Sequence, residues 1–216
     1  MVKKSMKKII TISAGAAVAA IILGLVIFMN ISNVEPKAET STSSKYVEAN
    51  SLLKERLAQN QIKMSSPIKL EKPETISKYC SLFSSPEKQK LVQYCTSTEL
   101  KDANGAFLGN IHMVGTSQDP KVIMTLIQTD NEISKFDSVK TAFRTVSDTL
   151  VCDCWSQKKP GNQITIDNWI EGLRDFQQNS TQTHSKSSVL SLEGKSLQLE
   201  LTRNNDGYLW QFFIYL

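Results

Sequence analysis

The sequence lacks the residues and motifs on which most enzymes rely. Its 216 residues include two histidines, His112 in a predicted strand and His184 in a polar stretch, although histidine is the side chain best suited to acid–base catalysis near neutral pH. G-x-S-x-G, P-loop, H-E-x-x-H and dinucleotide-binding patterns are missing. Carboxylate pairs such as Asp148 and Asp153 carry no signal in a chain with 21 acidic residues. We therefore expect a protein that is not an enzyme.

A basic excess is missing from most of the chain. The formal net charge of +4 comes from 25 Lys and Arg against 21 Asp and Glu, but four of the lysines lie within residues 1–8. The remainder therefore holds 21 basic and 21 acidic residues. Proteins that bind nucleic acids concentrate positive charge on one surface, so we exclude nucleic acid as a partner.

A second long apolar run is also missing, which excludes a multi-pass transporter or channel. The one run present, Ile9–Met29, is uncharged and contains eleven Ile, Leu, Val and Phe residues. As a helix rising about 1.5 Å per residue it would cross the ~30 Å hydrocarbon core of a bilayer. We predict a transmembrane anchor at residues 9–31, whose partner is the lipid bilayer, after a basic cytoplasmic N-terminus at residues 1–8.

The orientation of this span follows from its flanking charge. Lysines favour the cytoplasmic side, so the predicted location is the cell membrane, single-pass, with the C-terminal domain extracytoplasmic. A cleaved signal peptide would start in the same way, but its apolar core is usually about 7–15 residues long and ends at a small-x-small site. The small residues here lie in the first half of the run, so we favour an uncleaved anchor. Both alternatives give the same compartment.

Residues 32–73 are predicted to form a stalk with a juxtamembrane amphipathic helix. Residues 32–44 are polar and too poor in apolar side chains to build a core. Residues 46–60 then place apolar side chains on one helical face: Tyr46, Ala49, Leu53 and Leu57. This helix either pairs with a partner or docks on its own domain, and we favour docking because the pattern is too short for a coiled coil.

Residues 74–216 are predicted to form an extracytoplasmic α+β domain. Strand-like runs flank Asn104-Gly105 and Asp206-Gly207, which is typical of β-hairpins. The last run, Tyr208–Leu216, is apolar on both faces and should be a central or covered strand. Between these hairpins, apolar residues recur at helical spacing in two further segments. This grouping favours an antiparallel sheet with helices packed on one face.

The two central helices have recognisable limits. Apolar residues repeat from Phe136 to Val151, where Ser134 can cap the helix, and again from about Thr165 to Gln178. Pro160-Gly161 separates the two helices.

Four cysteines, Cys80, Cys95, Cys152 and Cys154, are the most suggestive residues. Outside the cytoplasm an even number of cysteines indicates disulfide bonds. A bond between Cys152 and Cys154 would close a very tight loop. We therefore expect each of these two to pair separately, one with Cys80 and the other with Cys95.

Two other uses of Cys152 and Cys154 remain open. Two thiolates one residue apart can hold a soft metal ion, with His112 or His184 completing the site, and copper(I) fits this spacing better than zinc. The pair could instead exchange disulfides with a partner, although the end of a predicted helix disfavours thiolate. In the same compartment Asn179-Ser180-Thr181 is a glycosylation sequon.

The closing part of the chain resembles a known family. Leu192–Ser196, an alternating strand to Arg203, a turn at Asp206-Gly207 and Tyr208–Tyr215 are similar to the last hairpin of PsbP-like domains, which are extrinsic accessory proteins of photosystems and their relatives. The resemblance covers Leu91–Leu216 and implies an α+β layout. The chain departs from that family at Cys152-Asp153-Cys154-Trp155 and in its end at Leu216. As a whole it also resembles uncharacterised single-pass membrane-anchored archaeal proteins, which implies location but no activity.

The sequence thus predicts a membrane-anchored extracytoplasmic accessory or binding domain without enzymatic activity or a required cofactor. A membrane protein complex is an expected partner. An extracytoplasmic copper-handling protein is the first alternative, and a thiol oxidoreductase is the second.

Overall fold

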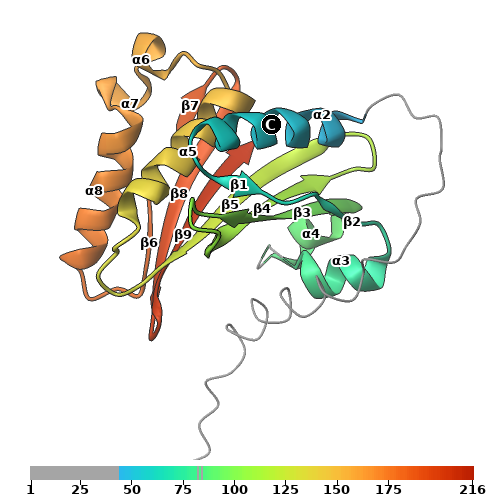
Figure 1. Ribbon diagram of the computed structural model, residues 1–216, viewed down its shortest axis with the longest axis horizontal. Helices are drawn as coiled ribbons and strands as arrows, with labels where there is room; N and C mark the ends of the chain where they lie inside the picture. The colour runs from blue at the N-terminus through green and yellow to red at the C-terminus, as the bar shows by residue number, and fades with distance from the viewer. Residues whose placement is uncertain (1–43, 82, 84) are drawn as a thin grey trace, which may run out of the picture. The chain divides into compact units, whose positions relative to one another are not determined.

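A computed structural model describes residues 44–81, 83 and 85–216, which all belong to one compact unit (Figure 1). The predicted N-terminus at 1–8 and anchor at 9–31 lie outside the described residues. Within the described ranges, no helix is both long and apolar enough to cross a bilayer.

A nine-stranded antiparallel sheet forms the centre of the described domain. Its main order is β1-β3-β4-β5-β9-β8-β6, with β2 paired to β3 and β7 paired to β8. The strands are β1 (Lys63–Met64), β2 (Ile68–Leu70), β3 (Tyr94–Lys101), β4 (Phe107–Gly115), β5 (Pro120–Thr129), β6 (His184–Lys186), β7 (Leu190–Leu192), β8 (Lys195–Asn204) and β9 (Gly207–Tyr215). The α+β prediction is confirmed at this level.

The helices pack on the two faces of this sheet. They are α2 (Lys45–Gln59), α3 (Pro73–Tyr79), α4 (Pro86–Lys90), α5 (Phe136–Leu150), α6 (Trp155–Lys158), α7 (Pro160–Gln163) and α8 (Ile166–Gln178). The three long helices, α2, α5 and α8, bury apolar side chains in the main core on one face of the sheet. Strand alternation supplies the other half of that core from residues such as Met113, Ile123 and Phe212.

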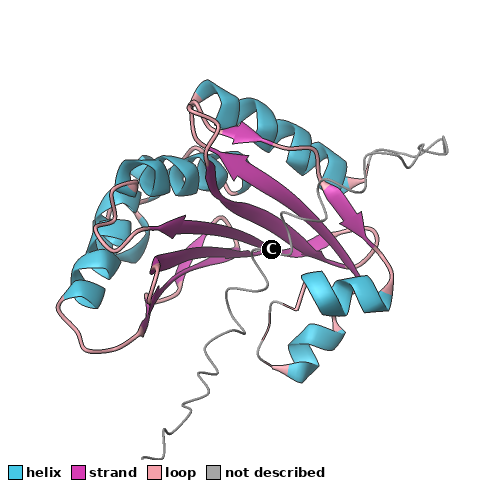
Figure 2. Ribbon diagram, turned by 60° about the horizontal axis from the view of Figure 1, so that its bottom comes forward, coloured by secondary structure: helices cyan, strands magenta, loops and turns pink. Residues whose placement is uncertain are grey.

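A second, smaller core lies on the opposite face. Cys95 and Val114, which are paired across β3 and β4, contact Ile76 of α3 together with Cys80 and Val92. Figures 1 and 2 show α3 and α4 on the side of the sheet away from the long helices. The expectation of helices on one face therefore holds for the long helices only, because an apolar pair on the other face of β3 and β4 also needs cover.

Residues 45–73, assigned from the sequence to a stalk, contribute a helix and two strands to the folded unit. Tyr46 of α2 is 1% exposed, and its hydroxyl donates to the Thr116 carbonyl oxygen at 2.8 Å. Its ring lies 4.6 Å from that of Tyr94, while Leu53 and Leu57 are fully buried. The amphipathic helix thus docks on its own domain, as favoured from its length.

The two hairpins and the central helices match the sequence pattern closely. β9 lies between β5 and β8, so the apolar strand is central, as predicted. Its Trp210 is fully buried, and the indole Nε1 donates to the Thr129 hydroxyl at 3.1 Å. The cap at Ser134 is a correction. Ser134 bonds to Asp130 in the preceding turn, and Lys135 occupies the N-cap of α5 without a side-chain bond.

The close pairing of β4 and β5 depends on Gly109. A Cβ at this position would lie 1.9 Å from the Leu126 carbonyl oxygen.

We expect Gly109→Ala to lower the free energy of unfolding by about 1–3 kcal/mol, because β4 and β5 must separate to make room for the added methyl group. The matched control is Gly172→Ala on α8, where an added Cβ has no neighbour within 4 Å and should stabilise by about 0.5–1 kcal/mol. Urea unfolding of the two variants measures both effects, and a loss at Gly172 equal to that at Gly109 would contradict the assignment.

Candidate functional site

All four cysteines are in disulfide bonds, but not in the expected pairs. Cys80 is bonded to Cys95 with a Cα separation of 6.6 Å, and Cys152 is bonded to Cys154 with a separation of 5.1 Å. The prediction that Cys152 and Cys154 pair with Cys80 and Cys95 is therefore wrong. The physical reason is the sheet itself, because one pair belongs to the small core on one face and the other packs against the main core on the opposite face.

The two bridges differ in what they can contribute to stability. Cys80–Cys95 spans 15 positions of sequence, which in the chain-entropy model corresponds to about 3 kcal/mol. Cys152–Cys154 spans 2 positions, and the same relation gives about 1.5 kcal/mol. The first bridge also fixes α3 to β3, whereas the second joins residues that the backbone already holds together. The short bridge is thus the one less needed by the fold.

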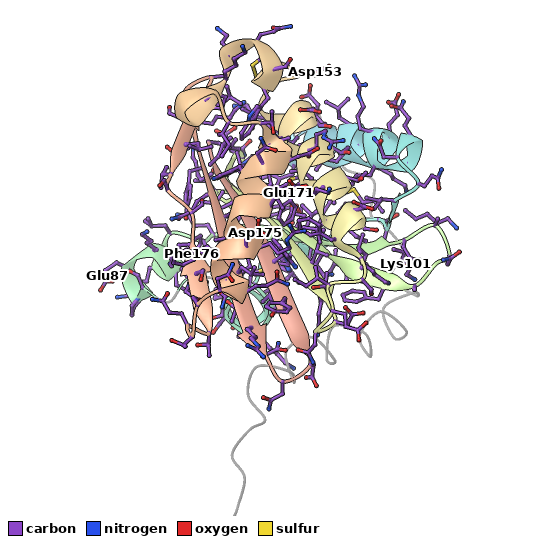
Figure 3. All side chains as sticks on the ribbon, turned by 90° about the vertical axis from the view of Figure 1, so that its left-hand side faces the viewer. Glu87, Lys101, Asp153, Glu171, Asp175 and Phe176 are labelled. Carbon is purple, nitrogen blue, oxygen red and sulfur yellow. A yellow bond between two sulfur atoms is a disulfide. The ribbon has the colours of Figure 1, made fainter. Side chains whose placement is uncertain are left out.

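The short bridge lies in a loop held at both ends. At its start the Val151 and Cys152 amides donate to the Ser147 carbonyl oxygen, which ends α5. After Cys154 the chain enters α6 with Trp155, whose buried indole donates to the Ile164 carbonyl oxygen at 2.9 Å. Both cysteines are partly exposed, and Asp153 between them is exposed. Figure 3 shows a sulfur–sulfur bond beside Asp153 at one end of the domain.

A small polar hollow adjoins this loop. Its volume is about 150 Å³. The lining residues come from α2, α5 and the loop: Arg56, Gln59, Asn60, Thr141, Arg144, Thr145, Asp148, Thr149 and Asp153. The two carboxyl groups that carried no sequence signal therefore face the same space, together with two guanidinium groups. Arg144 is held there by a two-pronged contact with Asp167 at 2.5 and 2.6 Å.

Asp148 has the most perturbed carboxyl group of the hollow. Half-burial between α2 and α5 raises its pKa to about 6, and the nearby negative charge of Asp153 raises it further, while Arg144 and Arg56 oppose the shift. A carboxyl group with this pKa changes protonation close to neutral pH, which is the property required of a group that takes up or gives back a proton. It lies one helical turn before Cys152.

A second cluster combines the other cysteine pair with a histidine. The sulfurs of Cys80 and Cys95 and a ring nitrogen of His112 all lie within 4.8 Å of one another. His112 is 9% exposed, and its buried Nδ1 has no hydrogen-bond partner within the part of the chain that the structure describes. Burial lowers the pKa of His112 to about 4, so the imidazole is neutral at physiological pH. Strand register brings the residues together, since Cys95 lies opposite Val114 and His112 lies opposite Ser97 on the same face.

The expected copper site is not assembled as predicted. Among the described residues, the one cluster of three potential ligands contains His112 with Cys80 and Cys95, not with Cys152 and Cys154. His184 lies at the sheet edge on β6, where its Nδ1 is 2.8 Å from the Thr202 hydroxyl and its Nε2 is 3.4 Å from Glu200. Sequence reasoning missed the cluster, although the Asn104-Gly105 turn fixes the register that produces it.

The sequon residue is placed on the surface. Asn179 is exposed at the C-cap of α8, and its Nδ2 donates to the Asp175 carbonyl oxygen at 2.8 Å. Its glycosylation stays a prediction.

Comparisons with known proteins add no identification. No protein-family model, curated protein or solved structure matches the chain. The resemblance of Leu91–Leu216 to PsbP-like domains therefore stays a prediction, and the site is interpreted from its own geometry.

The raised pKa of Asp148 predicts a specific pH dependence. The folded protein binds this proton more tightly than the unfolded chain, whose Asp titrates near 3.8, so Asp148 reduces stability progressively as the pH rises from about 4 through about 6. Asp148→Asn should therefore raise the free energy of unfolding at pH 8 by about 1 kcal/mol, a value discounted for the partial exposure of the group. At pH 4 the variant should match the parent.

Urea unfolding at the two pH values provides the measurement. Asp137→Asn, an exposed position at the start of α5, is the control and should show no gain at pH 8. A difference between the Asp148 variant and the parent that is the same at both pH values would contradict the burial of this carboxyl group.

Proposed function

We propose that the protein is a membrane-anchored extracytoplasmic domain that acts as a non-enzymatic accessory or binding module for a partner in or on the same membrane. The observation that carries this proposal is the pairing of all four cysteines within one domain, with Cys80–Cys95 fully buried. Disulfides of this kind persist in oxidising compartments and are rare in the cytosol. The uncharged run at Ile9–Met29 after four lysines supports the same compartment.

The length of chain before α2 limits where such a domain can act. Thirteen residues, 32–44, separate Ile31, the end of the predicted anchor, from Lys45, and a fully extended segment of this length spans at most about 50 Å. The domain would therefore remain near the bilayer surface and meet partners embedded in or bound to that membrane. An accessory role of this type is also what the resemblance to PsbP-like domains implies.

Protease accessibility in intact cells or spheroplasts tests the compartment. We expect added protease to remove the domain of the full-length protein without permeabilisation, because the flanking lysines hold the N-terminus inside. The control replaces Lys3, Lys4, Lys7 and Lys8 with Glu, which should reduce the fraction of exposed domains. Protection of the parent until the membrane is permeabilised would overturn the proposal.

Thiol–disulfide exchange is a second candidate function, favoured by the loop at Cys152–Cys154. This bridge is partly exposed, adds little to the stability of the fold, and follows Asp148, whose raised pKa suits proton transfer. A thiolate of a partner dithiol would attack one sulfur of the bridge, forming a mixed disulfide and releasing the other sulfur as a thiolate. The second thiol of the partner then loses its proton and closes the partner's own disulfide. Two electrons pass to Cys152 and Cys154, which become thiols by taking up this proton and one from solvent.

Limiting dithiothreitol separates an exchange-active bridge from a structural one. We expect Cys152–Cys154 to be reduced before Cys80–Cys95, because it is more accessible, as followed by alkylation and mass spectrometry. Asp148→Asn should slow this first reduction at pH 7 by about tenfold or more, since the group can no longer transfer a proton. Asp137→Asn is the matched control. Equal reduction rates for the two bridges, or no effect of Asp148→Asn, would exclude this function.

A further inference from the structure

The cluster of Cys80, Cys95 and His112 has the composition of a metal-binding site. Its three potential ligand atoms lie within 4.8 Å of one another, and all three residues are buried. A ring nitrogen of His112 thus lies beside both sulfurs of the bridge. Ring-nitrogen and sulfur ligands are those that soft metal ions prefer.

His112 provides a second, independent observation at the same position. Its Nδ1 is a buried polar atom that has no hydrogen-bond partner among residues 44–81, 83 and 85–216, in a side chain that is nine-tenths buried. Leaving such a group unpaired in a buried position is unfavourable, and a metal ion bound at this nitrogen would satisfy it. Its neutral imidazole is the form that binds metal ions.

We propose that the protein with Cys80 and Cys95 reduced binds one Cu(I) ion through these two sulfurs and His112. This site goes beyond the proposed accessory function and does not depend on it. The disulfide and the metal are alternative states of the same two sulfur atoms, so the site exists only before the bridge forms or after it is broken.

Reduction of the Cys80–Cys95 bond precedes binding of the metal ion. A dithiol reductant supplies two electrons and two protons to the Cys80–Cys95 bond, which yields two thiols and leaves the reductant as a disulfide. Binding of Cu(I) then displaces the thiol protons, since thiolates are the ligands. The metal does not change oxidation state. Exchange with a partner disulfide, which takes up two electrons and two protons and becomes a dithiol, would restore the Cys80–Cys95 bond and release the ion.

The number of ligands favours Cu(I) over zinc. Structural zinc sites almost always use four protein ligands, and within the described residues no fourth Cys, His, Asp or Glu joins this cluster. Cu(I) is satisfied by soft sulfur ligands and by imidazole. The backbone also holds two of the ligands at a fixed distance, because Cys95 and His112 lie on adjacent, paired strands. Cys80 reaches them from the C-cap of α3.

A competition titration tests the site in the full-length protein. The background variant carries Cys152→Ser and Cys154→Ser, so that Cys80 and Cys95 are the only possible thiols. After reduction and removal of the reductant, Cu(I) is added without oxygen against a chromogenic bicinchoninate chelator. We expect one Cu(I) per reduced chain and none per oxidised chain. X-ray absorption should show two sulfur neighbours and one nitrogen neighbour.

The histidines supply a matched pair of controls. His112→Gln should weaken Cu(I) binding at least tenfold, whereas His184→Gln, on the exposed strand β6, should leave it unchanged. Alkylation of Cys80 and Cys95 should abolish binding, and binding that survives alkylation would be adventitious. Equal affinity in the His112 variant overturns the proposal. So does a reduced protein that loses its circular-dichroism signature and does not recover it on adding Cu(I).

Discussion

Side chains alternate between the two faces of the sheet along the paired strands β3, β4, β5, β9 and β8. This alternation determines which residues form each of the two cores. One set of positions faces α2, α5 and α8 and forms the main core, and the other set faces away. A shift of one residue between β3 and β4 would turn Cys95 into the main core and separate it from both Cys80 and His112. The register therefore decides which cysteines can meet.

This constraint also explains what the sequence could and could not predict. Periodicity located the two hairpins, the central position of β9 and the helices α5 and α8, because each pattern is local and strong. It placed Tyr46 on an apolar face but could not show that the hydroxyl reaches the Thr116 carbonyl oxygen, 70 positions later. The short strands at the sheet edges, such as β6 and β7, have too few residues for periodicity to reveal.

The prediction of the disulfide pairs was wrong for a related reason. The usual Cα separation of disulfides disfavours a loop as tight as Cys152–Cys154, yet the observed 5.1 Å lies within the range that disulfides tolerate. The sequence alone does not show that the two cysteine pairs lie on opposite faces of the sheet, which keeps them apart. Asp148 carries no signal in the sequence because a carboxyl group acquires a raised pKa only from its surroundings, here the half-buried position between two helices.

The two cysteine pairs therefore have different physical roles within one domain. Cys80–Cys95 is buried and closes a loop long enough to stabilise the fold, so a change in its redox state would affect both α3 and the surroundings of His112. Cys152–Cys154 is partly exposed and spans only 2 positions of sequence. The buried Trp155 immediately after it anchors the loop. Opening of this bridge would leave the main core intact, because that core is held by helix packing on the sheet rather than by the bridge. The domain thus leaves one sulfur pair partly accessible to solvent while the other is buried.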